Sequence, residues 1–197
     1  MAEVAENLRS GGLRAVMLGA PGSGKGTQAE FLASALGVPA ISTGAMLRDA
    51  VALGSALGRK VEGIMAAGAL VDDALMAEVV RERLARPDAA GGFLLDGYPR
   101  TTGQAATLDS ILAERREKLD AVVMLDVAEP VLVGRAVARQ RADDREEVVR
   151  ERLRVYREKT EPLVEHYEGR NLLRRVDGER AVGEVTAAIL KILGRQA

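Results

Sequence analysis

A glycine-rich stretch near the N-terminus has the residue types and spacing of a loop that holds phosphate. Residues 18–28 are LGAPGSGKGTQ, in which Gly19 and Gly24 are separated by four residues and Lys25 follows directly. Glycines let the backbone bend so that successive N–H groups point at phosphate oxygens, and the lysine adds a full positive charge. Because the stretch follows an apolar run and opens a helical pattern, we interpret it as a phosphate-binding loop rather than a glycine-rich turn with an exposed lysine.

A second candidate for phosphate chemistry is the charged stretch ARQRADDRE at residues 138–146. A charge run of this kind is usually a solvated helix face. Arginine also binds phosphate oxygens in pairs through its planar guanidinium group, so the stretch is equally a candidate phosphate clamp. A ligand that carries several phosphate charges would need several such cations. The chain offers Arg48, Arg100, Arg135, Arg139, Arg141 and Arg152 for this, whereas we expect Arg145, Arg150 and Arg154 to be solvated.

Arg100 and Asp96 follow a short apolar run at residues 92–95 that favours a buried strand. Ligands of open α/β sheets bind where such strands end, so Arg100, in a glycine–proline turn, is a strong candidate for ligand binding. Asp96 is a hard oxygen ligand that could orient magnesium through water. Its alternative role is to cap a turn or helix.

Strand and helix patterns alternate along the chain. We expect strands at residues 13–18, 39–41, 92–95, 121–125 and 172–176. We expect helices at residues 24–36, from a cap at Ser42 or Thr43 to 51, then at 55–67, 72–85, 101–117, 130–138, 143–160 with a continuation to about 168, and 180–193. This alternation predicts a parallel sheet covered by helices on both faces.

Composition excludes several classes of site and partner. The chain has 197 residues, 47% of them apolar and 29% charged, with a net charge of −1, which is typical of one globular domain. It has no cysteine and a single histidine, His166, so disulfides and thiolate metal sites are excluded; we assign His166 no role. With 3% aromatic residues and no net positive charge, we expect no nucleic-acid partner. No apolar run approaches the ~18 residues of a membrane span, and the N-terminus lacks a signal pattern, so we expect no membrane partner and a cytoplasmic location.

Four stretches in order resemble the adenylate kinase family: LGAPGSGKGTQ, ISTGAMLR at residues 41–48, LLDGYPRT at 94–101 and RADDREEVVRERL at 141–153. The resemblance extends from about residue 14 to residue 193, and the Gly-Lys-Gly-Thr order after the loop is the family's own form. It implies a P-loop NTPase fold of the α/β class, with three αβα layers around a five-stranded parallel sheet. It further implies a single domain over residues 1–197, divided into a core (13–42, 72–135 and 145–197), a helical lobe for the nucleoside monophosphate (43–71) and a short lid (136–144).

The resemblance also implies the reaction and its residues. The expected enzyme transfers the terminal phosphoryl group of ATP reversibly to AMP, giving two ADP, with magnesium as cofactor. ATP would meet Gly22, Ser23, Gly24, Lys25, Gly26, Thr27, Arg135, Arg139 and Arg180. AMP would meet Thr43, Arg48, Ala69, Leu70, Val71, Gly97, Tyr98, Pro99, Arg100, Gln104, Arg141 and Arg152. The catalytic set would be Lys25, Arg100, Arg139, Arg141 and Arg152, with Asp143 and Asp144 pairing with arginines of the lid. We expect Leu153 and Tyr156 to serve packing instead.

Two positions depart from the family pattern. Ala45 stands where the family usually has aspartate, which bears on the capping of the helix that begins there, and Gly103 stands where it usually has proline. The lid is short and has no cysteine, so we expect no zinc, and we expect a monomer.

Two other functions compete with this interpretation. A kinase for UMP or CMP is disfavoured by Thr43, since the resemblance associates threonine at this position with AMP. A GTPase-like switch would need an Asn-Lys-x-Asp motif, which the sequence lacks.

Overall fold

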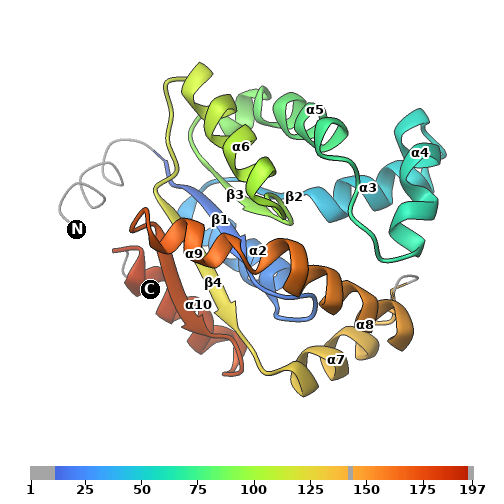
Figure 1. Ribbon diagram of the computed structural model, residues 1–197. Coiled ribbons are helices and arrows are strands. Elements are labelled where there is room, and N and C mark those ends of the chain that lie inside the picture. The colour runs from blue at the N-terminus through green and yellow to red at the C-terminus, as the bar shows by residue number, and fades with distance from the viewer. Residues whose placement is uncertain (1–11, 142–143, 195–197) are drawn as a thin grey trace.

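The structure is a computed structural model, and it describes residues 12–141 and 144–194. Five strands form one sheet: β1 (Arg14–Leu18), β2 (Ala40–Ser42), β3 (Phe93–Asp96), β4 (Ala121–Asp126) and β5 (Leu173–Asp177). Their order is β2-β3-β1-β4-β5, and every neighbouring pair is parallel (Figure 1). The predicted five-stranded parallel sheet is therefore confirmed.

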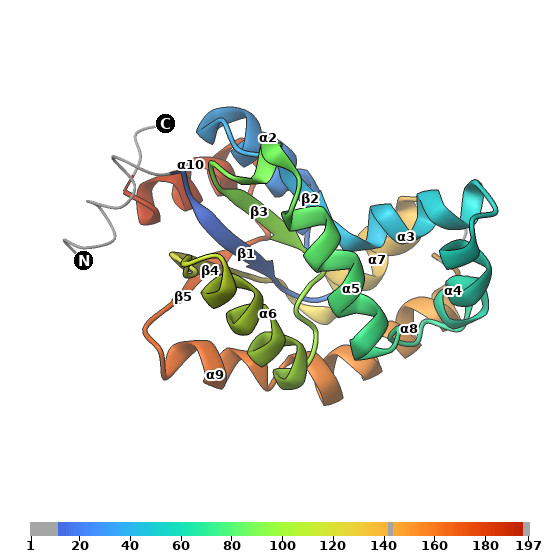
Figure 2. The ribbon, with the colours of Figure 1, turned by 90° about the horizontal axis from the view of Figure 1, so that it is seen from above.

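Helices cover both faces of the sheet, which confirms the three-layer arrangement (Figure 2). One face packs against α2 (Lys25–Leu36) and α10 (Val182–Ile192), where Met17, Leu32 and Ile189 share a core. The other face packs against α5 (Asp73–Leu84), α6 (Thr102–Glu114) and α9 (Leu163–Glu168), with a short 3₁₀ turn, η1 (Pro87–Ala89), before β3. Because the central strands are buried on both faces, β1 and β4 are nearly continuous apolar runs rather than alternating ones.

Two helices, α3 (Thr43–Ala52) and α4 (Ala56–Ala66), project beyond the sheet as a lobe (Figures 1 and 2). Ser42 is the cap of α3, because its Oγ accepts from the Ala45 backbone N–H at 3.4 Å. The departure at Ala45 therefore leaves this cap in place, since the hydroxyl that makes it belongs to Ser42. Ser55 caps α4 in the same way, with Oγ accepting from Gly58 N–H at 3.0 Å.

The C-terminal half contains the two clearest differences from the expected helix boundaries. The described helical path after the charged stretch begins with α8 (Glu146–Val155), continues through a π-helical turn, η2 (Tyr156–Thr160), and ends in α9. Residue 143, the expected start, lies outside the described residues. Helix α6 ends at Glu114 rather than 117, because Arg116 adopts a left-handed φ of 58°. The remaining helix, α7 (Glu129–Ala138), follows β4.

None of the helices in the described ranges is both long and apolar enough to span a bilayer.

Candidate functional site

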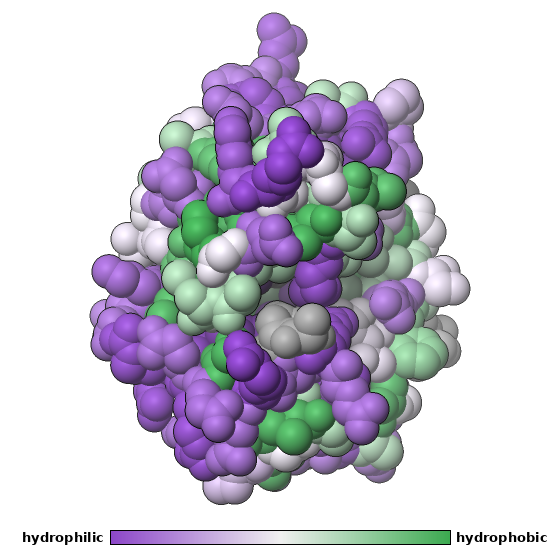
Figure 3. Space-filling view, turned by 90° about the vertical axis from the view of Figure 1, so that its right-hand side faces the viewer, coloured by the Kyte–Doolittle hydropathy of each residue, from purple (hydrophilic) through white to green (hydrophobic). Residues whose placement is uncertain are grey.

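A cleft of about 740 Å³ opens at the carboxyl ends of β1 and β3. It collects residues from the glycine loop, from α3, from the turn after β3, from α7 and α8, and from the loop after β5. The predicted residues that line it are Gly22, Ser23, Gly24, Lys25, Gly26, Thr27, Arg48, Leu70, Asp96, Gly97, Pro99, Arg100, Arg135, Arg139, Arg141, Arg152 and Arg180. Figure 3 views the molecule from the side that carries α4 and α8 in Figure 1, and this side of the protein is mostly hydrophilic.

The glycine loop has the backbone shape that its sequence predicts. Gly22 has φ of 87°, and a Cβ at this position would lie 2.3 Å from the Leu132 carbonyl oxygen, so only glycine fits. Gly24 precedes α2 in a left-handed conformation, and no side chain caps this helix. The first N–H groups of α2 therefore face the cleft with the positive end of the helix dipole, an arrangement suited to an anion.

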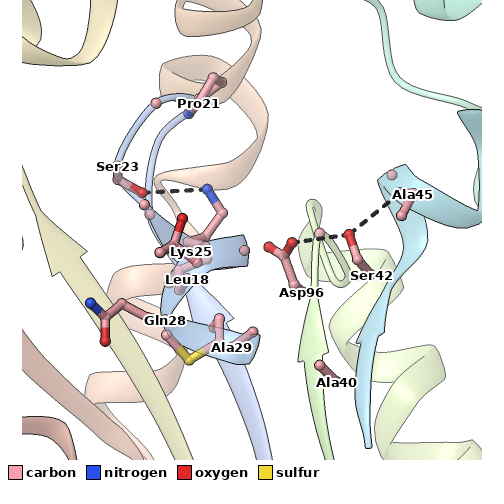
Figure 4. Close-up of a pocket in the computed structure, with 18 of the residues that line it drawn as sticks. Leu18, Pro21, Ser23, Lys25, Gln28, Ala29, Ala40, Ser42, Ala45 and Asp96 are labelled. Atoms are coloured by element: carbon pink, nitrogen blue, oxygen red, sulfur yellow. Dashed lines mark hydrogen bonds between the residues drawn. The ribbon is translucent and has the colours of Figure 1, made fainter. Parts of the chain in front are cut away.

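Lys25 lies at the mouth of this loop. Its ammonium donates to Ser23 Oγ at 3.4 Å (Figure 4) and to the Ala20 carbonyl at 2.9 Å. Both acceptors belong to the loop itself, so the ammonium is held over the hollow that the loop encloses. A bound phosphate would meet this charge without a rearrangement of the chain.

The charge on Lys25 is destabilised by its surroundings. Burial is the largest effect and lowers the pKa of Lys25 to about 8, while the Asp96 carboxylate raises it in part. Three guanidinium groups lower it further, those of Arg100, Arg152 and Arg139. The site therefore concentrates positive charge that an anionic ligand would relieve.

The turn after β3 brings Asp96 and Gly97 against the start of α3. Asp96 Oδ2 accepts from Ser42 Oγ at 3.1 Å (Figure 4). Thr43 Oγ1 donates to the Asp96 carbonyl at 3.3 Å. Gly97 has φ of 83°, and a Cβ there would approach Thr43 Oγ1 to 2.8 Å. Glycine is thus required both by the backbone conformation and by the closeness of the two segments.

Arg100 is fixed on this turn by three hydrogen bonds. Its Nε donates to the Gly97 carbonyl at 2.8 Å, and its backbone N–H donates to Gln104 Oε1 at 2.8 Å. Its carbonyl accepts from Thr160 Oγ1 at 2.8 Å, a contact supplied by the π-helical turn. The guanidinium group is therefore presented from a rigid support toward both cavities that it lines.

A smaller cavity of about 50 Å³ adjoins the cleft between the α3–α4 lobe and α6. Thr43 and Gln104 are buried at its wall, and its lining combines apolar side chains with a few polar and charged ones, as is typical of small-molecule sites. The predicted residues that line it are Thr43, Arg48, Ala69, Leu70, Val71, Gly97, Arg100, Gln104 and Arg152.

Asp144 is the shared hydrogen-bond acceptor of the arginines in and beside the charged stretch. Its side chain is 1% exposed and accepts from Arg139 Nε at 2.9 Å and Nη2 at 2.6 Å, and from Arg152 Nη1 at 3.5 Å. Its Oδ2 also accepts from the Arg141 backbone N–H at 3.0 Å. Burial alone would raise the pKa of Asp144, but the hydrogen bonds from Arg139 and the Arg141 amide hold it below its usual value. The predicted pairing of Asp144 with arginines is confirmed; Asp143 lies outside the described residues.

The opposite end of the cleft is closed by the loop after β5. Arg135 Nη1 donates to the Gly178 carbonyl at 2.8 Å and Nη2 to the Glu179 carbonyl at 3.3 Å, which ties α7 to this loop. Arg180 donates from Nε to Asp177 at 3.0 Å. The guanidinium of Arg135 thus positions the loop as well as lining the cleft.

Tyr98 is the one predicted site residue, among those that the structure describes, that lines neither the cleft nor the smaller cavity. It is 1% exposed, because its side chain belongs to the hydrophobic core between the sheet and the helices α5, α6 and α9. Leu153 is buried, as predicted, in a small hydrophobic cluster between α7 and α8. Tyr156 packs against this cluster and also lines the cleft.

The arginines expected to be solvated are exposed, and Arg150 and Arg154 pair with glutamates on the surface of α8.

Three residues make contacts that support the site and that the sequence does not reveal. Ser42 contacts Asp96 across 54 residues, Asp73 contacts Gln104 across 31, and Thr160 contacts Arg100 across 60. Each is an ordinary polar residue at the start of a helix or within one, and only the packing of the elements brings it to the site.

Within the described ranges, no three histidine, cysteine, aspartate or glutamate side chains are grouped to hold a metal ion.

Comparison with known proteins gives a consistent family. The family model "Adenylate kinase" matches residues 17–172. The chain is similar to an "Adenylate kinase" of Nocardia farcinica (strain IFM 10152), at 50% identity over 183 residues, 93% of this chain and 100% of that protein. It is also similar to an "Adenylate kinase" of Chelativorans sp. (strain BNC1), at 47% identity over 193 residues, 93% of this chain and 100% of the other. A third similar protein, an "Adenylate kinase" of Stenotrophomonas maltophilia (strain K279a), is 50% identical over 182 residues, 90% of this chain and 97% of the relative.

Proposed function

The chain belongs to the adenylate kinase family and transfers a phosphoryl group between ATP and AMP, and we propose that the cleft and the smaller cavity beside it are where it does so. The observation that carries the proposal is the arrangement of charge. A phosphate loop lies on one side, the smaller cavity lies on the other, and Arg100 and Arg152 line both spaces. This is the geometry for aligning two nucleotides phosphate to phosphate.

ATP is assigned to the glycine-loop side. The backbone N–H groups from Gly22 to Thr27 would surround its phosphates, and Lys25 would neutralise charge on the terminal one. Arg135 and Arg180 lie toward the loop after β5, where the adenine of ATP would be bound. Arg139 would meet the phosphates from α7.

AMP is assigned to the lobe side. Its base would enter the smaller cavity beside Thr43, Gln104 and the apolar segment at Ala69, Leu70 and Val71. Its phosphate would meet arginines at the boundary with the cleft, namely Arg48, Arg100, Arg141 and Arg152, with Gly97, Tyr98 and Pro99 contributing through their backbone.

The chemistry asks mainly for alignment and charge compensation. The attacking oxygen of the AMP phosphate and the leaving oxygen of ADP must lie in line through the phosphorus that moves. Lys25, Arg100, Arg139, Arg141 and Arg152 would offset the charge that spreads over that group. Lys25, Arg100 and Arg152 are already gathered in a partly buried site, so these three would need little reorganisation at the transition state, whereas Arg139 and Arg141 would reach the group when the lid closes.

We further propose that the chain is divided into a core (13–42, 72–135 and 145–197), a monophosphate-binding lobe (43–71) and a short lid (136–144). The α3–α4 helix pair, which projects from the sheet, supports the lobe. The network around Asp144 supports a lid whose closure brings arginines onto phosphate and excludes water.

Magnesium is the cofactor that this site fits. Asp96 and Thr27 supply two oxygens at the cleft, which suits an ion held mainly by nucleotide phosphates and water rather than by an all-protein site. Bound with ATP, magnesium would withdraw charge from the phosphate oxygens. Asp96 would hold the ion through water, and its hydrogen bond from Ser42 would orient the carboxylate.

The function is tested by a coupled assay for ADP formation from ATP with AMP, UMP, CMP or GMP as acceptor. We expect AMP to have a kcat/KM at least about a hundredfold above the pyrimidine nucleotides, because buried polar groups matched to one base reject another. Excess chelator should abolish turnover, and added magnesium should restore it. Preference for UMP or CMP would instead favour a pyrimidine monophosphate kinase, and ATP binding without any transfer would contradict the proposal.

The lowered pKa of Lys25 predicts that ATP binding takes up a proton above pH 8. In the free protein the pKa is about 8, and the phosphates of ATP would raise it by adding negative charge nearby. The contribution of Lys25 to ATP affinity should therefore be constant below pH 8 and fall as pH rises from 8 toward the pKa of the complex.

Calorimetry at pH 8.5 in buffers of different ionisation enthalpy measures this uptake. Lys25→Met should take up no proton in the same range. Equal proton uptake by the wild type and this variant would show that another group is responsible.

A further inference from the structure

Gln104, at the wall of the smaller cavity, has its side-chain amide held at both ends. Its Oε1 accepts from the Arg100 backbone N–H at 2.8 Å, and its Nε2 donates to Asp73 Oδ1 at 2.7 Å. Gln104 itself is 2% exposed, whereas Asp73 lies at the surface of the protein.

The chemistry of the two partners determines which way the amide faces. A backbone N–H can only donate a hydrogen bond, and a carboxylate can only accept one. An amide turned over would place its NH₂ against the Arg100 N–H and its oxygen against the Asp73 carboxylate, and both contacts would be repulsive. The orientation of Gln104 therefore follows from its neighbours and is not an arbitrary choice between oxygen and nitrogen.

Asp73 is in turn held in place by its own element and by α6. It is the first residue of α5, Asp72 caps that helix, and Thr101 Oγ1 donates to Asp73 Oδ2 at 3.0 Å. A Cβ on Gly103 would approach Asp73 Oδ2 to 3.3 Å, so the glycine at this departure from the family pattern leaves room for the carboxylate. Asp73 lines neither cavity, so its influence on a ligand would pass through Gln104.

We propose that Asp73 is a positioning residue that sets the specificity for a 6-amino purine by locking the orientation of the Gln104 amide. This rests on the proposed role of Gln104 in binding the base of AMP. One lone pair of Oε1 is engaged by the Arg100 N–H, and one N–H of Nε2 is engaged by Asp73. The amide keeps one acceptor, on Oε1, and one donor, on Nε2, for a ligand in the cavity. Adenine offers the complementary amino donor and ring-nitrogen acceptor on one edge.

A 6-oxo purine presents the opposite pattern on the same edge. Its O6 is an acceptor and its N1–H a donor, so each would face a like group on the locked amide of Gln104. If the amide were free to turn over, it could satisfy either purine. The fixed orientation of the amide therefore makes Gln104 selective for one purine, because the other purine would leave buried polar groups unpaired.

The test compares AMP with IMP, which differs from AMP at this edge of the base, as acceptors in the ADP-forming assay at saturating ATP. The variants are Asp73→Ala, which removes the acceptor, and Asp73→Ser, which suits the first turn of a helix but is too short to replace Oδ1. Asp73→Asn is the conservative variant, because it loses the charge yet keeps an acceptor for Gln104 Nε2. Asp72→Asn removes the neighbouring charge as a matched control, since asparagine also caps helices well.

We expect Asp73→Ala and Asp73→Ser to lower the ratio of kcat/KM for AMP over IMP about tenfold, the value of one well-made hydrogen-bond pair. The loss should come from a higher KM for AMP, with KM for ATP unchanged. Asp73→Asn should retain most of the ratio, and Asp72→Asn all of it. In a Gln104→Ala background, Asp73→Ala should have no further effect on the ratio, because the amide on which it acts is absent.

Equal losses with AMP and IMP would overturn the proposal, since they would indicate a structural role for Asp73. An undiminished effect in the Gln104→Ala background would overturn it as well. If Gln104→Ala itself keeps the wild-type ratio, Gln104 does not recognise the base and the proposal for Asp73 falls with it, although ATP:AMP transfer would stand. Failure of the wild type to use AMP would be the separate result that removes the proposed function.

Discussion

Replacing Lys25 by methionine should lower kcat for ADP formation by about two to three orders of magnitude, as expected when a preorganised charge contact worth ~3–4 kcal/mol at the transition state is lost. Methionine has nearly the same length and keeps the apolar stem, so the glycine loop should retain its shape. Stability should not fall, because the Lys25 ammonium is partly buried near Arg100, Arg139 and Arg152, and this environment lowers its pKa to about 8. Removing that charge relieves repulsion in the free protein.

Steady-state kinetics with ATP and AMP, together with thermal melting, measure both parts of this expectation. Lys191→Met is the matched control, because Lys191 is exposed in the last turn of α10, away from the cleft. It should keep the wild-type kcat. A folded Lys25→Met protein with near-normal turnover would remove Lys25 from the catalytic set.

Arg141→Ala should lower kcat by about a hundredfold or more while leaving the melting temperature nearly unchanged. The Arg141 side chain is exposed, and the hydrogen bond that this residue gives to Asp144 comes from its backbone N–H, which alanine retains. An exposed charge contributes at most ~1 kcal/mol to folding. Its expected contribution is to the phosphoryl group in the closed state, where water is excluded and charge contacts strengthen.

Arg139→Ala should lower both turnover and stability. It removes the hydrogen bonds at 2.9 and 2.6 Å from Arg139 to Asp144, whose side chain is 1% exposed. The contacts that remain are those from the Arg141 backbone N–H at 3.0 Å and from Arg152 Nη1 at 3.5 Å. Leaving a buried carboxylate partly unsatisfied costs ~1–3 kcal/mol. The two arginines of one short stretch are therefore distinguished by their melting curves.

The control for both variants is Arg150→Ala, because Arg150 pairs with Glu146 on the exposed surface of α8. Its kcat, KM and melting temperature should match the wild type within error. If Arg139→Ala and Arg141→Ala also keep wild-type kcat and KM for both nucleotides, the stretch is only a charged surface and the clamp hypothesis is wrong.

The strands and the phosphate loop were predictable from the sequence because their signals are local. Buried parallel strands are continuous apolar runs, and β1 and β4 lie where those runs occur. The glycine spacing around Lys25 predicted a bent loop between a strand and a helix, and Gly22 and Gly24 have the positive φ values that such a bend needs. In both cases the preference belongs to the residues themselves or to their immediate neighbours.

Helix boundaries were predicted less well, because the turn that follows a helix can end it before the helix propensity of its residues would. Helix α6 stops early at Glu114, where the chain turns through a left-handed Arg116 to reach β4. The long charged helix contains a π-helical turn at Tyr156–Thr160, which brings Thr160 to the Arg100 carbonyl. A periodic pattern of apolar residues does not reveal one extra residue in a turn.

By itself the sequence determined the parallel α/β architecture, the place of the phosphate loop and the set of arginines from which a phosphate site could be made. Only the tertiary structure decided how those groups are partnered. Asp144 joins Arg139 and Arg152, Ser42 orients Asp96, and Asp73 orients Gln104 across 31 residues of chain. The physical reason is that propensity and periodicity depend on residues a few positions apart, whereas a hydrogen bond between elements depends on how the helices stack against the sheet and which side chains that stacking brings within about 3 Å.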